Sequence, residues 1–78
     1  MRDPEKALFL ARSAAELSPL PHVLDTLATA FWANGFIEEA IATERQALEK
    51  DTRQAPFYEL QLERFKNEQY RDSTQFIN

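Results

Sequence analysis

The single histidine is the first residue to test for chemistry. His22 precedes Asp25 by three residues, so on a helix both side chains would share one face and could offer two ligands to a metal ion. Protein metal sites of this kind use three or four ligands, and no third suitable residue lies nearby in the sequence. An exposed histidine near a helix start is the favoured interpretation, and we expect no metal and no other cofactor.

The remaining reactive groups give no better case for catalysis. His22 is the only histidine that could act as a base, and the serines lie in no nucleophile-elbow motif. The paired carboxylates, Glu38 with Glu39 and Glu59 with Glu63, are typical of solvated helix faces. One glycine cannot form a glycine-rich phosphate loop, and the absence of cysteine excludes thiolate chemistry and disulfides. We expect that the protein is not an enzyme.

Composition excludes two further classes of partner. The 78 residues are 44% hydrophobic and 28% charged, and no apolar run approaches the roughly 18 residues of a membrane span. The net charge is −4 and the lysines and arginines are scattered singly, which disfavours nucleic acid. The absence of cysteine fits a reducing compartment, so we expect a cytoplasmic protein. The length allows one domain or less.

Helix-forming residues fill the chain, and its prolines and one glycine divide it into four helices. Asp3 suits an N-cap and Pro4 the first helical position, whereas Asn34-Gly35 suits a helix end. The sequence predicts helices from about Pro4 to Leu17, Pro21 to Asn34, Ile37 to Lys50, and from near Pro56 to at least Asn67.

Each expected helix has an apolar stripe at spacings of three and four residues. The stripes consist, helix by helix, of Ala7, Leu8, Ala11, Ala14 and Ala15; of Leu24, Leu27, Ala28 and Phe31; of Ile37, Ala40, Ile41, Ala47 and Leu48; and of Tyr58, Leu62 and Phe65, with Phe57 and Leu60 beside them. Short connections make neighbouring helices antiparallel.

The spacing within residues 21–54 carries a repeat pattern. Leu24-x2-Leu27-Ala28-x2-Phe31 is followed by Gly35 and by the alanines at 40 and 47, and this segment resembles one tetratricopeptide repeat. The resemblance implies an all-α fold of antiparallel helical hairpins in a right-handed solenoid. It also implies a repeat core of Leu24, Leu27, Ala28, Phe31, Gly35, Ala40 and Ala47.

The flanking segments resemble parts of the same repeat. Residues 1–20 would be the second helix of a preceding repeat, 55–70 a capping helix equivalent to the first helix of a following repeat, and 71–78 a tail. Because no first helix precedes residues 1–20, we expect the chain to be an excerpt of a longer array. Glu44 replaces the usual aromatic, which predicts either a thinner core or a charged partner such as Arg12 or Arg45.

The resemblance further implies a concave groove that binds a peptide or protein, basic or apolar more readily than acidic. Carried over by position, its residues are His22, Asp25, Thr29, Trp32, Ala33, Glu59, Glu63 and Lys66. Trp32 has two interpretations, an exposed anchor for a partner or a side chain packed against the fourth helix. The alternative function is self-association, with Leu8, Ala11 and Ala15 of the first helix meeting a second chain in a homodimer.

Overall fold

The computed structural model describes residues 3–68, which form four α-helices and one 3-10 turn and contain no strand. The helices are α1 (Pro4–Leu17), α2 (Pro21–Ala33), α3 (Ile37–Lys50) and α4 (Ala55–Asn67), and the turn η1 (Thr52–Gln54) precedes α4. The four predicted helices are confirmed, with ends shifted by at most one residue. The predicted tail, 71–78, lies outside the described residues.

Local signals account for the helix ends. The side chain of Asp3 accepts a hydrogen bond from the backbone N–H of Lys6 at 3.2 Å, which satisfies one of the free donors of the first turn. Gly35 adopts a φ of 85°, a left-handed conformation that side chains with a Cβ disfavour. This conformation reverses the chain between α2 and α3, so the two helices run antiparallel.

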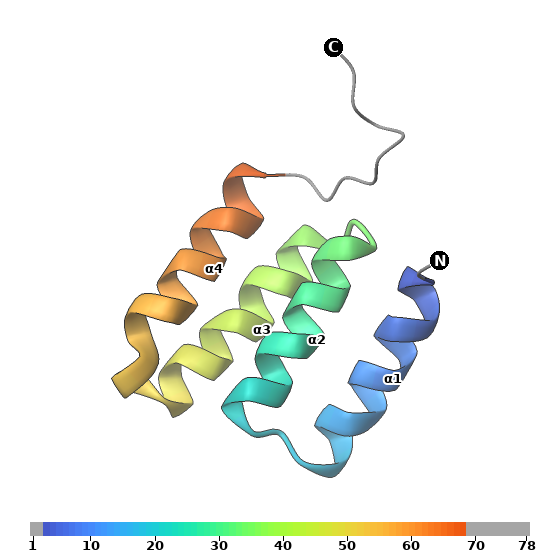
Figure 1. Cartoon of the computed structure of the whole chain (residues 1–78), viewed down its shortest axis with the longest axis horizontal. Helices are drawn as coiled ribbons and strands as arrows, with labels where there is room; N and C mark the ends of the chain where they lie inside the picture. The colour runs from blue at the N-terminus through green and yellow to red at the C-terminus, as the bar shows by residue number, and fades with distance from the viewer. Residues whose placement is uncertain (1–2, 69–78) are drawn as a thin grey trace.

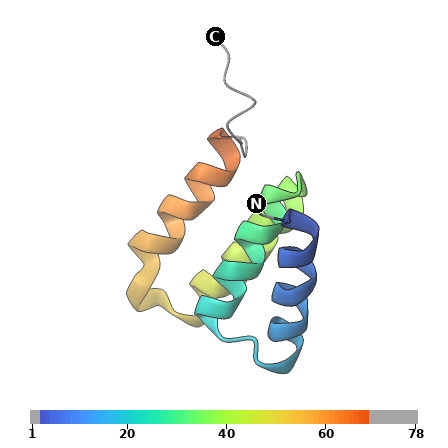
Figure 2. The same cartoon turned by 45° about the vertical axis from the view of Figure 1, so that its right-hand side comes forward.

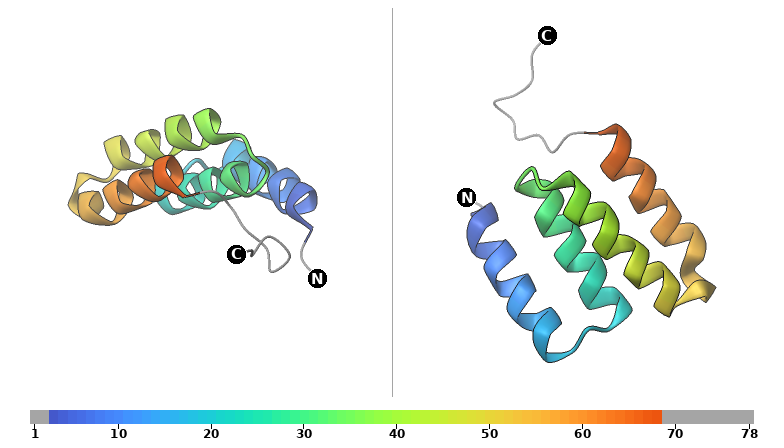
Figure 3. Two further views of the ribbon diagram at one scale, coloured as in Figure 1. Left: turned by 90° about the horizontal axis from the view of Figure 1, so that it is seen from above. Right: turned by 180° about the vertical axis from the view of Figure 1, so that it is seen from behind.

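The helices lie in chain order as an up-and-down row (Figures 1 and 2). α1 packs against α2, α2 against α3, and α3 against α4. Seen from above, α3 forms a second layer beside α2 and α4 (Figure 3, left). A row of this kind has two outer helices, α1 and α4, each covered by neighbours on one side only.

The core runs along the row in three clusters whose side chains grow larger toward α4. The first joins α1 to α2, the second joins α2, α3 and α4, and the third joins the opposite ends of the same three helices. Their buried members are Leu8, Ala11, Leu27 and Ala30; Ala28, Trp32, Ala40 and Phe65; and Leu24, Ala47 and Tyr58.

Some predicted core positions are wrong. Ala7 and Ala14 are exposed, because α1 turns Leu8 and Ala11 toward α2 and both alanines lie about 100–120° around the helix from Leu8. Gly35 is exposed in its turn, and Phe31 is half-buried, with its ring edge-on to Phe36 at 6.3 Å between centroids. The other five repeat-core positions are buried: Leu24, Leu27, Ala28, Ala40 and Ala47.

Among the described residues, no helix has the length and apolar character needed to cross a membrane.

Candidate functional site

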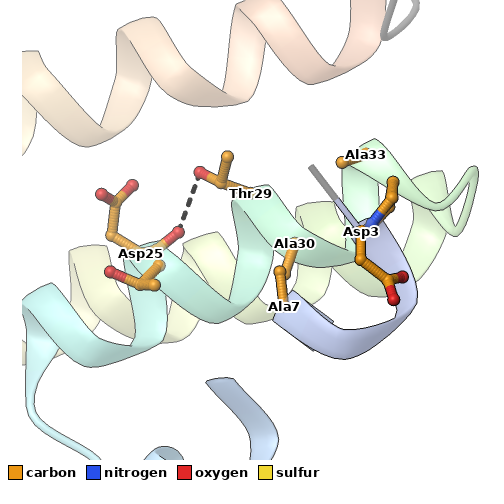
Figure 4. A pocket seen from close by; sticks show the side chains of 8 residues that line it. Asp3, Ala7, Asp25, Thr29, Ala30 and Ala33 are labelled. Atoms are coloured by element: carbon orange, nitrogen blue, oxygen red, sulfur yellow. Dashed lines mark hydrogen bonds between the residues drawn. The ribbon is translucent and has the colours of Figure 1, made fainter. Parts of the chain in front are cut away.

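A hollow of about 430 Å³ opens between α1 and α2. Figure 4 shows the side chains around it, which come from the N-terminal turn of α1 and from one face of α2. They are Asp3, Pro4 and Ala7, and Asp25, Thr26, Thr29, Ala30 and Ala33. The hollow exists because the facing positions of the two helices carry alanines, which are too short to fill the space between the backbones. We call it the α1–α2 hollow.

The polar groups of the hollow are largely occupied within their own helix. Thr29 Oγ1 donates to the carbonyl oxygen of Asp25 at 3.0 Å, shown as the dashed line in Figure 4, and Thr26 Oγ1 donates to that of His22 at 3.0 Å. The threonines therefore present mainly methyl groups, whereas Asp3 and Asp25 bring two carboxylates. The lining is apolar with an acidic character, and it offers acceptors rather than donors.

Only part of the predicted groove meets at this hollow. Asp25, Thr29 and Ala33 line it, whereas His22 is exposed at the start of α2 and does not. The three predicted positions on α4, Glu59, Glu63 and Lys66, are exposed away from the hollow. Glu63 accepts a hydrogen bond from Asn67 of the same helix at 3.0 Å.

Trp32 packs against the fourth helix, the second of its two interpretations, and is only 5% exposed. Its ring lies 5.6 Å from that of Phe65, and its Nε1–H donates to the carbonyl oxygen of Glu68 at 2.8 Å. The guanidinium of Arg64 stands 4.6 Å from the ring centroid, a cation–π distance. Trp32 therefore attaches α4 to α2 instead of presenting an anchor to a partner.

The buried carboxyl of Glu44 is the second chemical feature of this region. Glu44 has no exposed surface, and neither of its carboxyl oxygens has a hydrogen-bond partner among the described residues. Of the two outcomes expected for it, the charged partner is wrong, since neither Arg12 nor Arg45 reaches it. Its neighbour on α2 is Asp25, which accepts a hydrogen bond from Gln61 of α4 at 3.1 Å.

Burial decides the protonation of Glu44. Loss of water raises its pKa from the usual 4.5 to about 9; the hydrogen bond that a protonated Glu44 would donate to Asp25, and the negative charge of Asp25, act in the same direction. Burial, and then the charges of Asp51, Asp25 and Glu44, also raises the pKa of Tyr58 on α4. Glu44 is therefore a neutral acid at pH 7, enclosed where α2, α3 and α4 meet.

The sequence analysis did not predict five of the residues that line the hollow, namely Asp3, Pro4, Ala7, Thr26 and Ala30. The alanine at position 7 was assigned to the core, and nothing in the pattern tells a covered alanine from an uncovered one. Glu44, by contrast, was recognisable as unusual in the sequence, because it occupies a position that is usually aromatic in the repeat pattern.

The described residues contain no group of three or more histidine, cysteine, aspartate or glutamate side chains placed to hold a metal ion. The sequence matches no protein-family model, no curated protein and no solved structure. The tetratricopeptide resemblance therefore stays a prediction that rests on the residues quoted for it.

Proposed function

We propose that the protein is a protein-interaction scaffold of the helical-repeat kind, which binds a peptide or a helix of a partner in the α1–α2 hollow. The observation that carries the proposal is the lining of that hollow, which is apolar except for two carboxylates and two internally bonded threonines. Such a surface gains free energy when an apolar side chain displaces water from it.

The charge of the surface selects among peptides. Asp3 and Asp25 stand at the hollow, and the whole chain carries a formal charge of −4. An acidic peptide would meet like charges, whereas a basic or apolar peptide would not. The preferred ligand is a segment with one or two apolar side chains for the hollow and a lysine or arginine beside them.

The repeat pattern supports the same role. In the tetratricopeptide pattern, Ala28 and Ala40 are the small residues at which the paired helices meet. Both belong to one buried cluster between α2 and α3. The proposal extends this pairing to a right-handed solenoid in which α1 belongs to one repeat, α2 and α3 form the next, and α4 caps it. In such an array the grooves between neighbouring helices are the surfaces that take partners.

The test uses three synthetic helical peptides of equal length: leucine with lysine, leucine with glutamate, and serine with lysine. Each carries a fluorescent label, because Trp32 is buried against α4 and would report on that helix instead of the hollow. We expect the leucine–lysine peptide to bind most tightly in fluorescence anisotropy. If the serine–lysine peptide binds equally well, charge alone accounts for the interaction, and the proposal that an apolar side chain binds in the hollow is wrong.

A substitution in the hollow locates the site. Thr26 is exposed and lines the hollow, so Thr26→Arg places a long cation there and should weaken the leucine–lysine peptide about tenfold or more, a change of about 1.4 kcal/mol. Thr52→Arg is the matched control, since Thr52 is exposed on η1 away from the hollow. If both variants weaken binding equally, the peptide responds to net charge and the assigned site is wrong.

A further inference from the structure

Asn34 and Gly35 lie in the turn between α2 and α3, at the same end of the row as the start of α1 (Figure 1). They form the only asparagine–glycine pair of the sequence. Because glycine has no Cβ, its backbone nitrogen is little hindered and can attack the side-chain amide of the asparagine before it. A Cβ at Gly35 would have no atom within 4 Å, so water and hydroxide reach this turn. The pair therefore has the chemistry of a spontaneous deamidation site.

The side-chain amide of Asn34 ties two helices together. Its Nδ2 donates to the carbonyl oxygens of Pro4 in α1 and of Ala30 in α2, each at 2.8 Å. Both partners only accept hydrogen bonds, so the group that faces them has to be a donor, and the two N–H groups of the amide serve both. Asn34 is half-buried in this place, where water replaces a lost bond poorly. A carboxylate, which only accepts, cannot take over the contact.

We propose that Asn34 is a deamidation site and that its conversion to an acid releases the start of α1 from α2. In the first step hydroxide removes the proton of the Gly35 nitrogen, and this nitrogen forms a bond to Cγ of Asn34. The Cγ–Nδ2 bond breaks, and Nδ2 takes a proton from water and leaves as ammonia. One water then opens the cyclic imide on either side, which gives aspartate or isoaspartate. The net reaction consumes one water, yields one ammonia and needs no oxidant or reductant.

The folded turn slows this reaction. The ψ of Asn34 is 7°, which nearly eclipses its own nitrogen with that of Gly35 about the Cα–C bond. Ring closure requires Cβ of Asn34 in that position instead, so the backbone has to rotate first. The N–H of Gly35 also donates to the carbonyl oxygen of Trp32 at 3.0 Å. The attack therefore waits for a local opening of the turn, which breaks fewer contacts than global unfolding does.

The product cannot restore the contact between the helices. The new carboxylate would face the carbonyl oxygens of Pro4 and Ala30 without a proton to donate, in a half-buried place that disfavours an unpaired charge. It would also stand at the C-cap of α2, the negative end of the helix dipole. The positive end of α1 gives little in return, because the carboxylate of Asp3 already accepts a hydrogen bond from the first turn there. We therefore expect the start of α1 to stay detached after the reaction.

The first experiment incubates the whole 78-residue chain at mildly alkaline pH, folded and in urea, and follows residue 34 by peptide mass spectrometry. We expect Asn34 to become aspartate and isoaspartate in both samples, but about tenfold or more slowly when folded, since the turn must open first. In urea, Gly35→Ala should slow the conversion, because its Cβ hinders the attacking nitrogen. Asn67 precedes Glu68 and should keep its amide. A folded chain that converts no faster than its unfolded fraction, known from urea denaturation, allows would overturn the proposal.

The second experiment installs the product directly. Asn34→Asp should speed the hydrogen exchange of α1 amides by more than about tenfold, and by more than Asn34→Ala does, because alanine removes the two bonds without adding a charge. Asn67→Asp is the matched control, since it places its new charge within α4 beside Glu63 and should leave α1 unchanged. If α1 of Asn34→Asp exchanges as slowly as in the parent chain, the proposed release is wrong. Neither experiment uses peptide binding, so the proposed function and the modification site can fail separately.

Discussion

The two outer helices, α1 and α4, occupy similar positions at the ends of the row but bury different numbers of large side chains. α4 leaves Phe57 and Leu60 exposed but buries three large residues, Tyr58, Leu62 and Phe65. A hydrogen bond from Trp32 and a cation–π contact from Arg64 reinforce its attachment. α1 turns only one large residue inward, Leu8, together with the small Ala11. Its other large residues, Phe9, Leu10 and Leu17, are exposed.

This difference gives the two outer helices different roles. Large buried side chains give most of the free energy of a core, so α4 closes the row at its end. Small buried side chains and large exposed ones leave α1 held more weakly and ready for a further contact. The end of the molecule with the weaker internal packing is therefore the end with the candidate binding surface, as expected where binding regions come from the less stable parts of a structure.

The largest expected effect tests how α4 is attached. Phe65 is 1% exposed and packs with Trp32, Ala28 and Ala40, so Phe65→Ala should lower the free energy of unfolding by about 3–5 kcal/mol. A chain of this length has a total stability of only about 4–12 kcal/mol, so much of the variant would be unfolded or would have α4 detached. Urea denaturation followed by circular dichroism measures the loss.

Phe57→Ala is the control for that experiment. The same side chain is removed from the same helix, but Phe57 is 47% exposed and stacks edge-on with Tyr58 at 5.3 Å. We expect a loss of about 1 kcal/mol, in the range measured for an aromatic pair. Similar losses for the two variants would mean that α4 is not attached through Phe65, and the contrast between the outer helices would disappear.

The second prediction concerns the acid buried beneath α4. The pKa of Glu44 is about 9 in the folded chain against the usual 4.5, so the folded state holds a proton that the unfolded state releases. Its stabilising contribution is complete below about pH 4.5, decreases as the pH rises and is absent above about pH 9. We expect unfolding by urea to become easier across this range, with a slope of at most about 1.4 kcal/mol per pH unit.

Glu44→Gln keeps the size of the side chain and removes its titration, so the slope should flatten and the chain should gain stability at pH 8 relative to pH 4. Glu49→Gln is the matched control, because Glu49 is exposed on the same helix, and its slope should equal that of the parent chain. If Glu44→Gln keeps the full slope of unfolding free energy against pH, the pH dependence comes from other groups and not from the acid buried beneath α4.

The sequence predicted the helices well because their signals are local. Asp3 before Pro4, the two prolines at 19 and 21, and Asn34-Gly35 each act through the backbone of a few neighbouring residues. The inward faces of α2 and α4 also followed from spacing, since Leu24, Leu27 and Ala28 and then Tyr58, Leu62 and Phe65 are buried. The stripe of α4 is its whole buried set, whereas α2 also buries Ala30 and Trp32 beside its stripe.

The sites were harder to predict because they depend on which neighbour covers a face. The stripe of α1 is apolar around half of the helix, and spacing alone could not decide whether α2 covers Leu8 and Ala11 or Ala7 and Ala14. The burial of Trp32 was open for the same reason, since its position beside Phe31 fits both an outward anchor and a contact with α4. The protonation of Glu44 needs the depth of its burial, which no local pattern gives.

The smallest expected effect tests how α1 is held. Asn34 Nδ2 donates to the carbonyl oxygens of Pro4 and Ala30, each at 2.8 Å, and so ties the start of α1 to the end of α2. Asn34→Ala removes both bonds and should cost about 0.5–1.5 kcal/mol. Because α1 has few large buried residues, we expect this loss to appear as faster hydrogen exchange of α1 amides, by up to about tenfold, with α4 amides unchanged.

Asn67→Ala is the matched control, because Asn67 donates a hydrogen bond to Glu63 of the same helix at 3.0 Å and lies at the other end of the row. It should leave the exchange of α1 amides unaltered. If Asn34→Ala instead speeds α1 and α4 amides by the same factor, the two outer helices open together in one cooperative step. The weak packing of α1 would then not make it a separately mobile element, and its binding role would have to rest on the shape and chemistry of the α1–α2 hollow alone.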